Sequence, residues 1–166
     1  MIVADIPFFF LKQQANISWL EVKYGLERQL IKPKVAIEKA MDRLVDSDEC
    51  SPEEIELAGL SEYDSVIELV ESLASADENI CTDIQAKWLY LFLAWLFNNQ
   101  TSVKDPLDIV EMAYSDFDYP EEIAPFIRYM PMVGLDLGSK ELNEARLYDY
   151  WKQYLEDAAK KFGHAQ

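Results

Sequence analysis

Apolar residues recur along this chain at the spacing of helices, and one stretch is apolar without interruption. Residues 88–97 are ten consecutive apolar side chains, and Lys87 is the only charged residue between positions 84 and 97. A helix that is apolar on every side has no face for water, so other helices must surround it. The pattern therefore predicts a buried central helix at residues 82–100.

Helix start signals divide the rest of the chain. Ser18 and Glu21, like Ser51 and Glu54, are placed three residues apart as in a capping box, and Pro52 suits the first turn of the second helix. Further helix starts are predicted at Pro33, at Ser61 or Asp64, at Thr82 with Gln85 completing its box, at Asp105–Pro106, at Pro120 and at Ser139. No stretch alternates convincingly between apolar and polar residues as a strand does.

These signals predict an all-α protein. We expect a single domain over residues 1–166, a compact bundle of eight or nine helices around the helix at residues 82–100. Half of the 166 residues are apolar, which excludes a disordered chain. Pro125 lies inside the helix predicted to start at Pro120. It cannot donate a backbone hydrogen bond, so we expect a kink or a restart there.

The N-terminal residues and the cysteines indicate a cytoplasmic protein. Residues 1–11 contain an apolar patch without a basic leader or a cleavage site, so no signal peptide is predicted. The ten-residue apolar run falls short of the roughly 20 residues that span a membrane. Cys50 and Cys81 lack the spacing of a zinc site or a disulfide framework, so we expect two reduced thiols.

Charge is distributed unevenly along the chain. The net charge is −16 and the isoelectric point is near 4.3. Thirteen acidic residues and no basic residue lie between Arg43 and Lys87, so this segment carries −13 of the total. Such a charge repels nucleic acid, disfavours anionic membranes and favours a basic protein partner.

Five carboxylates of this base-free segment are the candidate partner-binding residues, and we name them the acidic face: Glu53, Glu56, Asp64, Glu68 and Glu71. On a helix that starts near Ser61, the last three lie at i, i+4 and i+7 and form one stripe. Four apolar residues of that helix are predicted to face the core: Val66, Ile67, Val70 and Leu73. Two interpretations stay open, a solvated surface that maintains solubility and a docking face that steers a basic protein.

Catalytic motifs are not found in the sequence. His164, the only histidine, lies near the end of the chain, and neither a phosphate-binding glycine loop nor a His-Glu metal motif occurs. We therefore predict no catalytic residue, no cofactor and no enzymatic activity.

One acidic cluster, at a junction of two predicted helices, supports an alternative: Asp116, Asp118, Glu121 and Glu122. Their carboxylates could bind a divalent ion or act as acid and base. The competing explanation is structural, with Asp118 capping the next helix and the two glutamates favouring its N-terminal dipole. Arg128 is predicted to form an ion pair with this cluster rather than a substrate clamp.

Several motifs carry a resemblance to a known family: Ser18-Trp-Leu-Glu21, Tyr24-Gly-Leu26, residues 40–44, Glu56-Leu-Ala58, Lys87-Trp-Leu-Tyr90, and the distinctive Asp116–Ile123 leading into Phe126–Pro131. With them the chain resembles, from about residue 10 to residue 155, a family of small bacterial proteins known only as a domain of unknown function. The resemblance implies an all-α fold. Members look like proteins encoded near secreted polymorphic toxins, which suggests an immunity role, and the family brings no catalytic residues.

The function we expect is non-enzymatic binding of a basic protein, such as a toxin domain, by an immunity-type protein through the acidic face. The alternative is a carboxylate-based metal-dependent enzyme or metal-binding protein that uses the cluster from Asp116 to Glu122.

Overall fold

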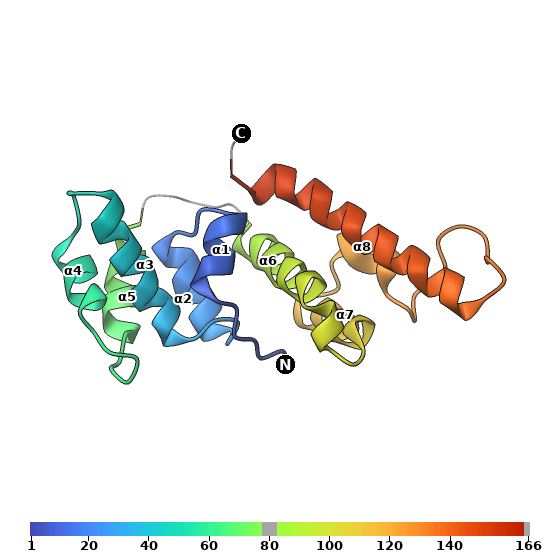
Figure 1. Ribbon diagram of the computed structural model, residues 1–166, viewed down its shortest axis with the longest axis horizontal. Helices are drawn as coiled ribbons and strands as arrows, with labels where there is room; N and C mark the ends of the chain where they lie inside the picture. Colours follow the sequence, from blue (N-terminus) through green and yellow to red (C-terminus); the bar gives the residue numbers. More distant parts are fainter. Residues whose placement is uncertain (78–82, 165–166) are drawn as a thin grey trace. The chain divides into compact units, whose positions relative to one another are not determined.

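A computed structural model describes residues 1–77 and 83–164 (Figure 1). All regular secondary structure of these residues is helical, with eight α-helices and two short 3-10 helices, and none of them forms a strand. The predicted all-α class is therefore confirmed. The chain divides into two compact units, an N-terminal unit (Val3–Ile84) and a C-terminal unit (Gln85–Gln166 with Met1–Ile2). The single-domain assignment stays a prediction.

The N-terminal unit is built from five helices in its described part: α1 (Phe8–Gln14), α2 (Trp19–Glu27), α3 (Pro33–Asp46), α4 (Pro52–Ala58) and α5 (Ile67–Ser75). Helix α3 packs against α1 and α4, and α5 packs against α2 and α4. Leu11, Val35 and Leu57 are among the side chains that these contacts bury almost completely. Burial of such branched apolar side chains is the main force that holds short helices together.

The predicted capping boxes are present at two helix starts. The Ser18 side chain accepts a hydrogen bond from the Glu21 backbone N–H, and the Glu21 carboxylate accepts one from the Ser18 backbone N–H. Ser51 and Glu54 form the same reciprocal pair at α4. These bonds satisfy backbone donors that a helix start leaves open. The predicted caps on two later helices, α7 (Pro106–Asp116) and α8 (Lys140–Phe162), are also confirmed, while that at Thr82 lies outside the described residues.

Helix α5 begins later than predicted. Its first residue is Ile67, and Val66 occupies the N-cap position without a side-chain hydrogen bond. Asp64 instead accepts hydrogen bonds from the backbone N–H and the hydroxyl of Ser61, at 2.8 and 3.1 Å. The prediction that Ser61 or Asp64 caps this helix is therefore wrong, because these two residues close a separate turn with each other.

The C-terminal unit contains α6 (Ile84–Asn98), η1 (Gln100–Ser102), α7 (Pro106–Asp116), η2 (Glu121–Phe126) and α8 (Lys140–Phe162). Eight consecutive residues of α6, from Lys87 to Ala94, are buried. Eight residues are more than two helical turns, so this helix is buried on every side, as its sequence predicts. Helix α8 packs against η2, and its Trp151 is fully buried there.

The segment that starts at Pro120 differs from its prediction. Residues Glu121–Phe126 form a 3-10 helix that continues through Pro125 without a break, so the predicted kink or restart is wrong. Its N-cap position is Pro120, and no side chain caps it. Asp118 has φ +61° and belongs to the turn before this helix, so its predicted capping role is also wrong. Asp tolerates this left-handed backbone better than most residues do.

Candidate functional site

The acidic face lies on two neighbouring helices of the N-terminal unit and the segment between them. Helix α4 carries Glu53 and Glu56, α5 carries Glu68 and Glu71, and Asp64 lies in the turn that connects the two helices. The two helices contact each other (Figure 1, left). Four of the five side chains are exposed and Glu53 is half-buried. The five predicted residues thus lie on two adjoining helices and on the turn that connects them.

Basic side chains do not neutralise these carboxylates. Among the residues that the structure describes, none of the five forms an ion pair. Within the described residues, the hydrogen bonds that Asp64 accepts come from Ser61. Glu68 lies in the first turn of α5, where the helix dipole favours a negative charge. Uncompensated like charges on adjacent turns destabilise a helix slightly. The acidic face is therefore stabilised mainly by hydration.

The predicted stripe is only partly formed. Glu68 and Glu71 share the exposed side of α5, but Asp64 precedes the helix and does not extend their row. The prediction that Ile67 faces the core is wrong, because its side chain is 48% exposed. Ile67 is the first residue of α5, so the turn that would precede it in a helix starting near Ser61 is absent. Val66, Val70 and Leu73 are buried as predicted.

Three exposed apolar side chains lie on the same elements as the acidic face. Ile55 on α4 is 56% exposed, Tyr63 in the connecting turn is 90% exposed, and Ile67 begins α5. The sequence pattern does not indicate that any of the three is exposed. The structure supplies the reason for Ile55: Leu57 is fully buried two residues later, and two residues in a helix are separated by about 200° around its axis. Ile55 must therefore point away from the core.

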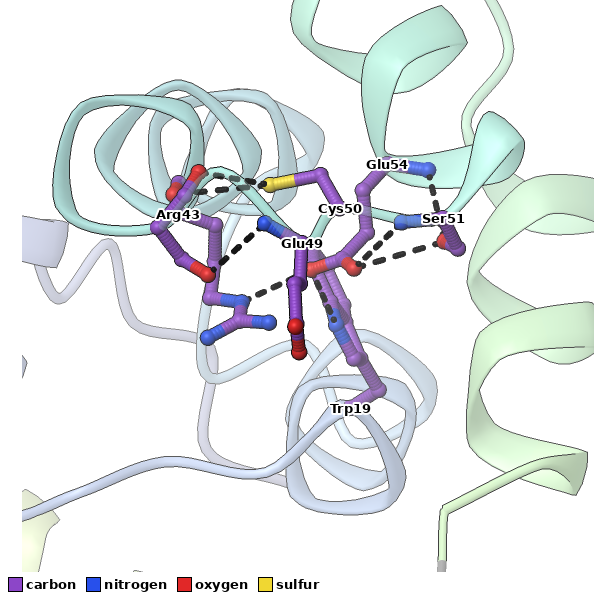
Figure 2. A network of polar contacts seen from close by, with 7 residues as sticks. Trp19, Arg43, Glu49, Cys50, Ser51 and Glu54 are labelled. Carbon is purple, nitrogen blue, oxygen red and sulfur yellow. Dashed lines mark hydrogen bonds and ion pairs between the residues drawn. The ribbon is translucent and has the colours of Figure 1, made fainter.

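A buried carboxylate fixes the start of α4 and, with it, the acidic face. Glu54 is only 5% exposed. It accepts hydrogen bonds from Arg43 Nε at 2.9 Å, the Ser51 backbone N–H at 3.1 Å and Trp19 Nε1 at 3.3 Å (Figure 2). These donors come from α3, the α4 N-cap and α2. One side chain thus joins three helices.

The ionisation of Glu54 follows from this network. Burial alone would raise its pKa, but the hydrogen bonds from Arg43, Ser51 and Trp19 and the Arg43 charge outweigh burial and hold the pKa below its ordinary value. The same partnership raises the pKa of Arg43. Both groups stay charged at neutral pH, and the pair is a structural feature of this unit.

The alternative acidic cluster is not assembled as a metal site. The Asp116 carboxylate accepts a hydrogen bond from the Ile2 backbone N–H, while Asp118, Glu121 and Glu122 are exposed. Within residues 1–77 and 83–164, no group of three or more His, Cys, Asp or Glu side chains is arranged to hold a metal ion. Asp116 therefore has a structural partner, and the other three carboxylates face solvent.

Arg128 forms ion pairs, but with partners other than that cluster. Its Nε lies 2.8 Å from Glu111 and its Nη1 lies 3.0 Å from Asp105. The hydrogen bond to Glu111 is the main cause that raises the pKa of Arg128. The predicted partners are therefore wrong. Arg128 instead joins the end of η2 to both the N-cap and the body of α7.

A comparison with known protein families covers the part of the chain that contains these residues. A family model described as uncharacterized protein conserved in bacteria (DUF2247) matches residues 8–159. The chain belongs to this family. The DUF2247 match confirms the resemblance noted from the sequence motifs, and it includes both the acidic face and the segment from Asp116 to Glu122. A search of curated proteins and a search of solved structures each found no match.

The length and polarity of a helix decide whether it could cross a membrane. In the described part of the chain, every helix is too short or too polar to cross a membrane.

Proposed function

We propose that this DUF2247 chain is a non-enzymatic protein-binding protein that docks a basic protein through its acidic face. One observation carries the proposal: in the described structure the exposed carboxylates of α4 and α5 lack ion-pair partners, and exposed apolar side chains lie on the same helices and on the turn between them. A surface that serves only solubility normally mixes both signs of charge. A docking surface combines charge complementarity with a few apolar or aromatic anchors.

Tyr63 is the strongest candidate anchor on this surface. Its side chain is 90% exposed and lies in the turn that also contains Asp64. Tyrosine is enriched among the residues that dominate interface energies, since its ring buries a large area and its hydroxyl stays hydrated. We therefore assign Tyr63 the apolar contact at the centre of the interface and Glu68 and Glu71 the steering charges around it.

The charge of the surface defines the class of partner. An acidic field raises the association rate of a basic protein by roughly 10- to 1,000-fold at low ionic strength. Proteins that act on nucleic acid present basic faces, and an acidic protein that covers such a face mimics the phosphate backbone. A toxin domain of this kind, neutralised by an immunity-type protein, is the partner we propose.

The test is a low-salt pull-down with the full chain, followed by binding kinetics on the protein it recovers. We expect the variant Glu68→Lys/Glu71→Lys to weaken association about 10-fold or more, mostly in the on-rate, because both steering charges change sign. Tyr63→Ala is expected to increase the off-rate, since it removes an apolar contact. Surface plasmon resonance at two salt concentrations measures both rates.

The matched control is Asp149→Lys/Glu156→Lys, which changes the net charge equally at two exposed positions of α8. It is expected to keep near wild-type association. Equal loss in both double variants would show attraction by net charge alone and would refute docking at the acidic face. A pull-down that recovers no basic protein would also count against the proposal.

A further inference from the structure

The C-terminal unit contains a pocket of about 590 Å³ that none of the acidic-face residues lines. Its walls come from the end of η2, the loop at residues 127–139 and the first three turns of α8. Pockets that bind small molecules typically have volumes of about 300–1,000 Å³. The cavity is therefore of a size that holds a small organic molecule.

The loop that forms one wall is held in place by side chains of α8. Arg146 Nη1 donates to the Leu135 carbonyl at 2.6 Å, and the Tyr150 hydroxyl donates to the Val133 carbonyl at 3.3 Å. The Asn143 side chain accepts from the Leu137 backbone N–H and donates to Asp136, both at 3.0 Å. A wall fixed by four such bonds loses little further freedom when a ligand binds.

The lining combines apolar walls with balanced charge. Met130, Val133 and Leu147 are among its apolar residues. Its charged residues are Arg128, Asp136, Lys140, Glu144 and Arg146. The Arg128 charge is offset by Glu111 and Asp105, so two positive and two negative groups remain to face a ligand.

Four charged side chains of the lining can still pair with charged groups of a ligand: Asp136, Lys140, Glu144 and Arg146. In the described structure Lys140, Glu144 and Arg146 form no ion pair, and Arg146 uses one N–H on the Leu135 carbonyl. Hydrogen bonds from the Asn143 amide and the Gly138 backbone N–H, together with the nearby Arg146 charge, lower the pKa of Asp136, so it stays ionised. A pocket lined by two cations and two carboxylates favours neither an anion nor a cation. It complements a molecule that carries both charges on an apolar body.

We propose that this pocket binds a short apolar peptide with free termini, of about two residues. The peptide carboxylate pairs with Lys140 and Arg146, its ammonium group pairs with Glu144 and Asp136, and its side chains contact the apolar wall. The pocket volume, the fixed loop and the charge balance support this occupant together.

The test is an NMR titration of the isotope-labelled full chain with four probes: leucyl-leucine, its N-acetyl form, its C-terminal amide and the doubly capped form. The free dipeptide is expected to bind best and to shift signals of residues 130–150. Each singly capped probe is expected to bind about 5-fold more weakly, because the partly exposed ion pairs of one terminus are lost.

Two variants assign the charges. Lys140→Gln is expected to reduce the advantage of the free carboxylate, and Glu144→Gln that of the free ammonium group. Lys152→Gln, an exposed lysine of α8 outside the pocket, is the matched control and should bind like wild type. Equal binding of all four probes, shifts outside the pocket, or no binding at millimolar concentration would each overturn the proposal.

Discussion

Replacement of Trp151 by alanine is expected to destabilise the C-terminal unit by about 3–5 kcal/mol. The side chain is fully buried. Its ring meets Phe97 edge-on at 5.1 Å and lies against Tyr148 and Phe126 at 5.7 and 6.2 Å between centroids. These rings come from α6, α8 and η2, so the substitution opens a cavity where three helices meet. Urea denaturation followed by near-ultraviolet circular dichroism measures the loss.

Trp151→Phe is the matched control for the alanine variant. Trp151 Nε1 has no hydrogen-bond partner in the described part of the chain, so phenylalanine removes an unsatisfied donor while it keeps an aromatic ring. The expected loss is about 1–2 kcal/mol, since only part of the ring volume disappears. If the alanine variant lost less than about 1 kcal/mol, Trp151 could not be a central packing residue of this unit.

The features that the sequence predicts well depend on near neighbours along the chain. The boxes at Ser18–Glu21 and Ser51–Glu54 involve residues three positions apart, and the burial of α6 follows from an unbroken apolar run. Such interactions repeat with the period of the helix itself, so their pattern is visible without knowledge of the fold. The all-α class follows from them.

The errors arise where two explanations fit the same local pattern. Ser61 and Asp64 have the composition of a helix start, yet they bond to each other in a turn and leave α5 to begin at Ile67. The partners of Arg128 are 17 and 23 residues away, and no periodicity indicates contacts at that separation. Local composition therefore predicts that a charge is paired and leaves its partner undetermined.

The acidic face also combines a feature that the sequence predicts with one that it does not predict. A long segment without basic residues makes exposed carboxylates at its surface predictable, and the structure exposes four of the five acidic-face side chains. Tyr63 is different, since an aromatic residue in a sequence is more often buried than exposed. Its exposure depends on the turn that Ser61 and Asp64 close. The apolar anchor of the proposed interface could therefore be identified from the structure but not from the sequence.

Glu54→Ala is expected to destabilise the N-terminal unit by about 3 kcal/mol. The substitution leaves the Arg43 guanidinium, Trp19 Nε1 and the Ser51 backbone N–H without their shared acceptor. The value lies near the low end for a broken buried pair because the Arg43 side chain is 42% exposed and can regain water. Thermal or urea unfolding at neutral pH measures the loss.

A pH series separates the charge of Glu54 from its packing. The folded-state pKa of Glu54 lies below its ordinary value of 4.5. The stabilisation from ionised Glu54 is therefore fully present above that pH and is lost as the pH falls through the folded-state pKa. The stability difference between wild type and Glu54→Gln should shrink over this acidic range. Glu53→Ala, at a half-buried neighbour that forms no ion pair with the described residues, should change stability by less than about 0.5 kcal/mol. A pH-independent difference for Glu54→Gln would mean that shape, rather than charge, makes this carboxylate the link between α2, α3 and α4.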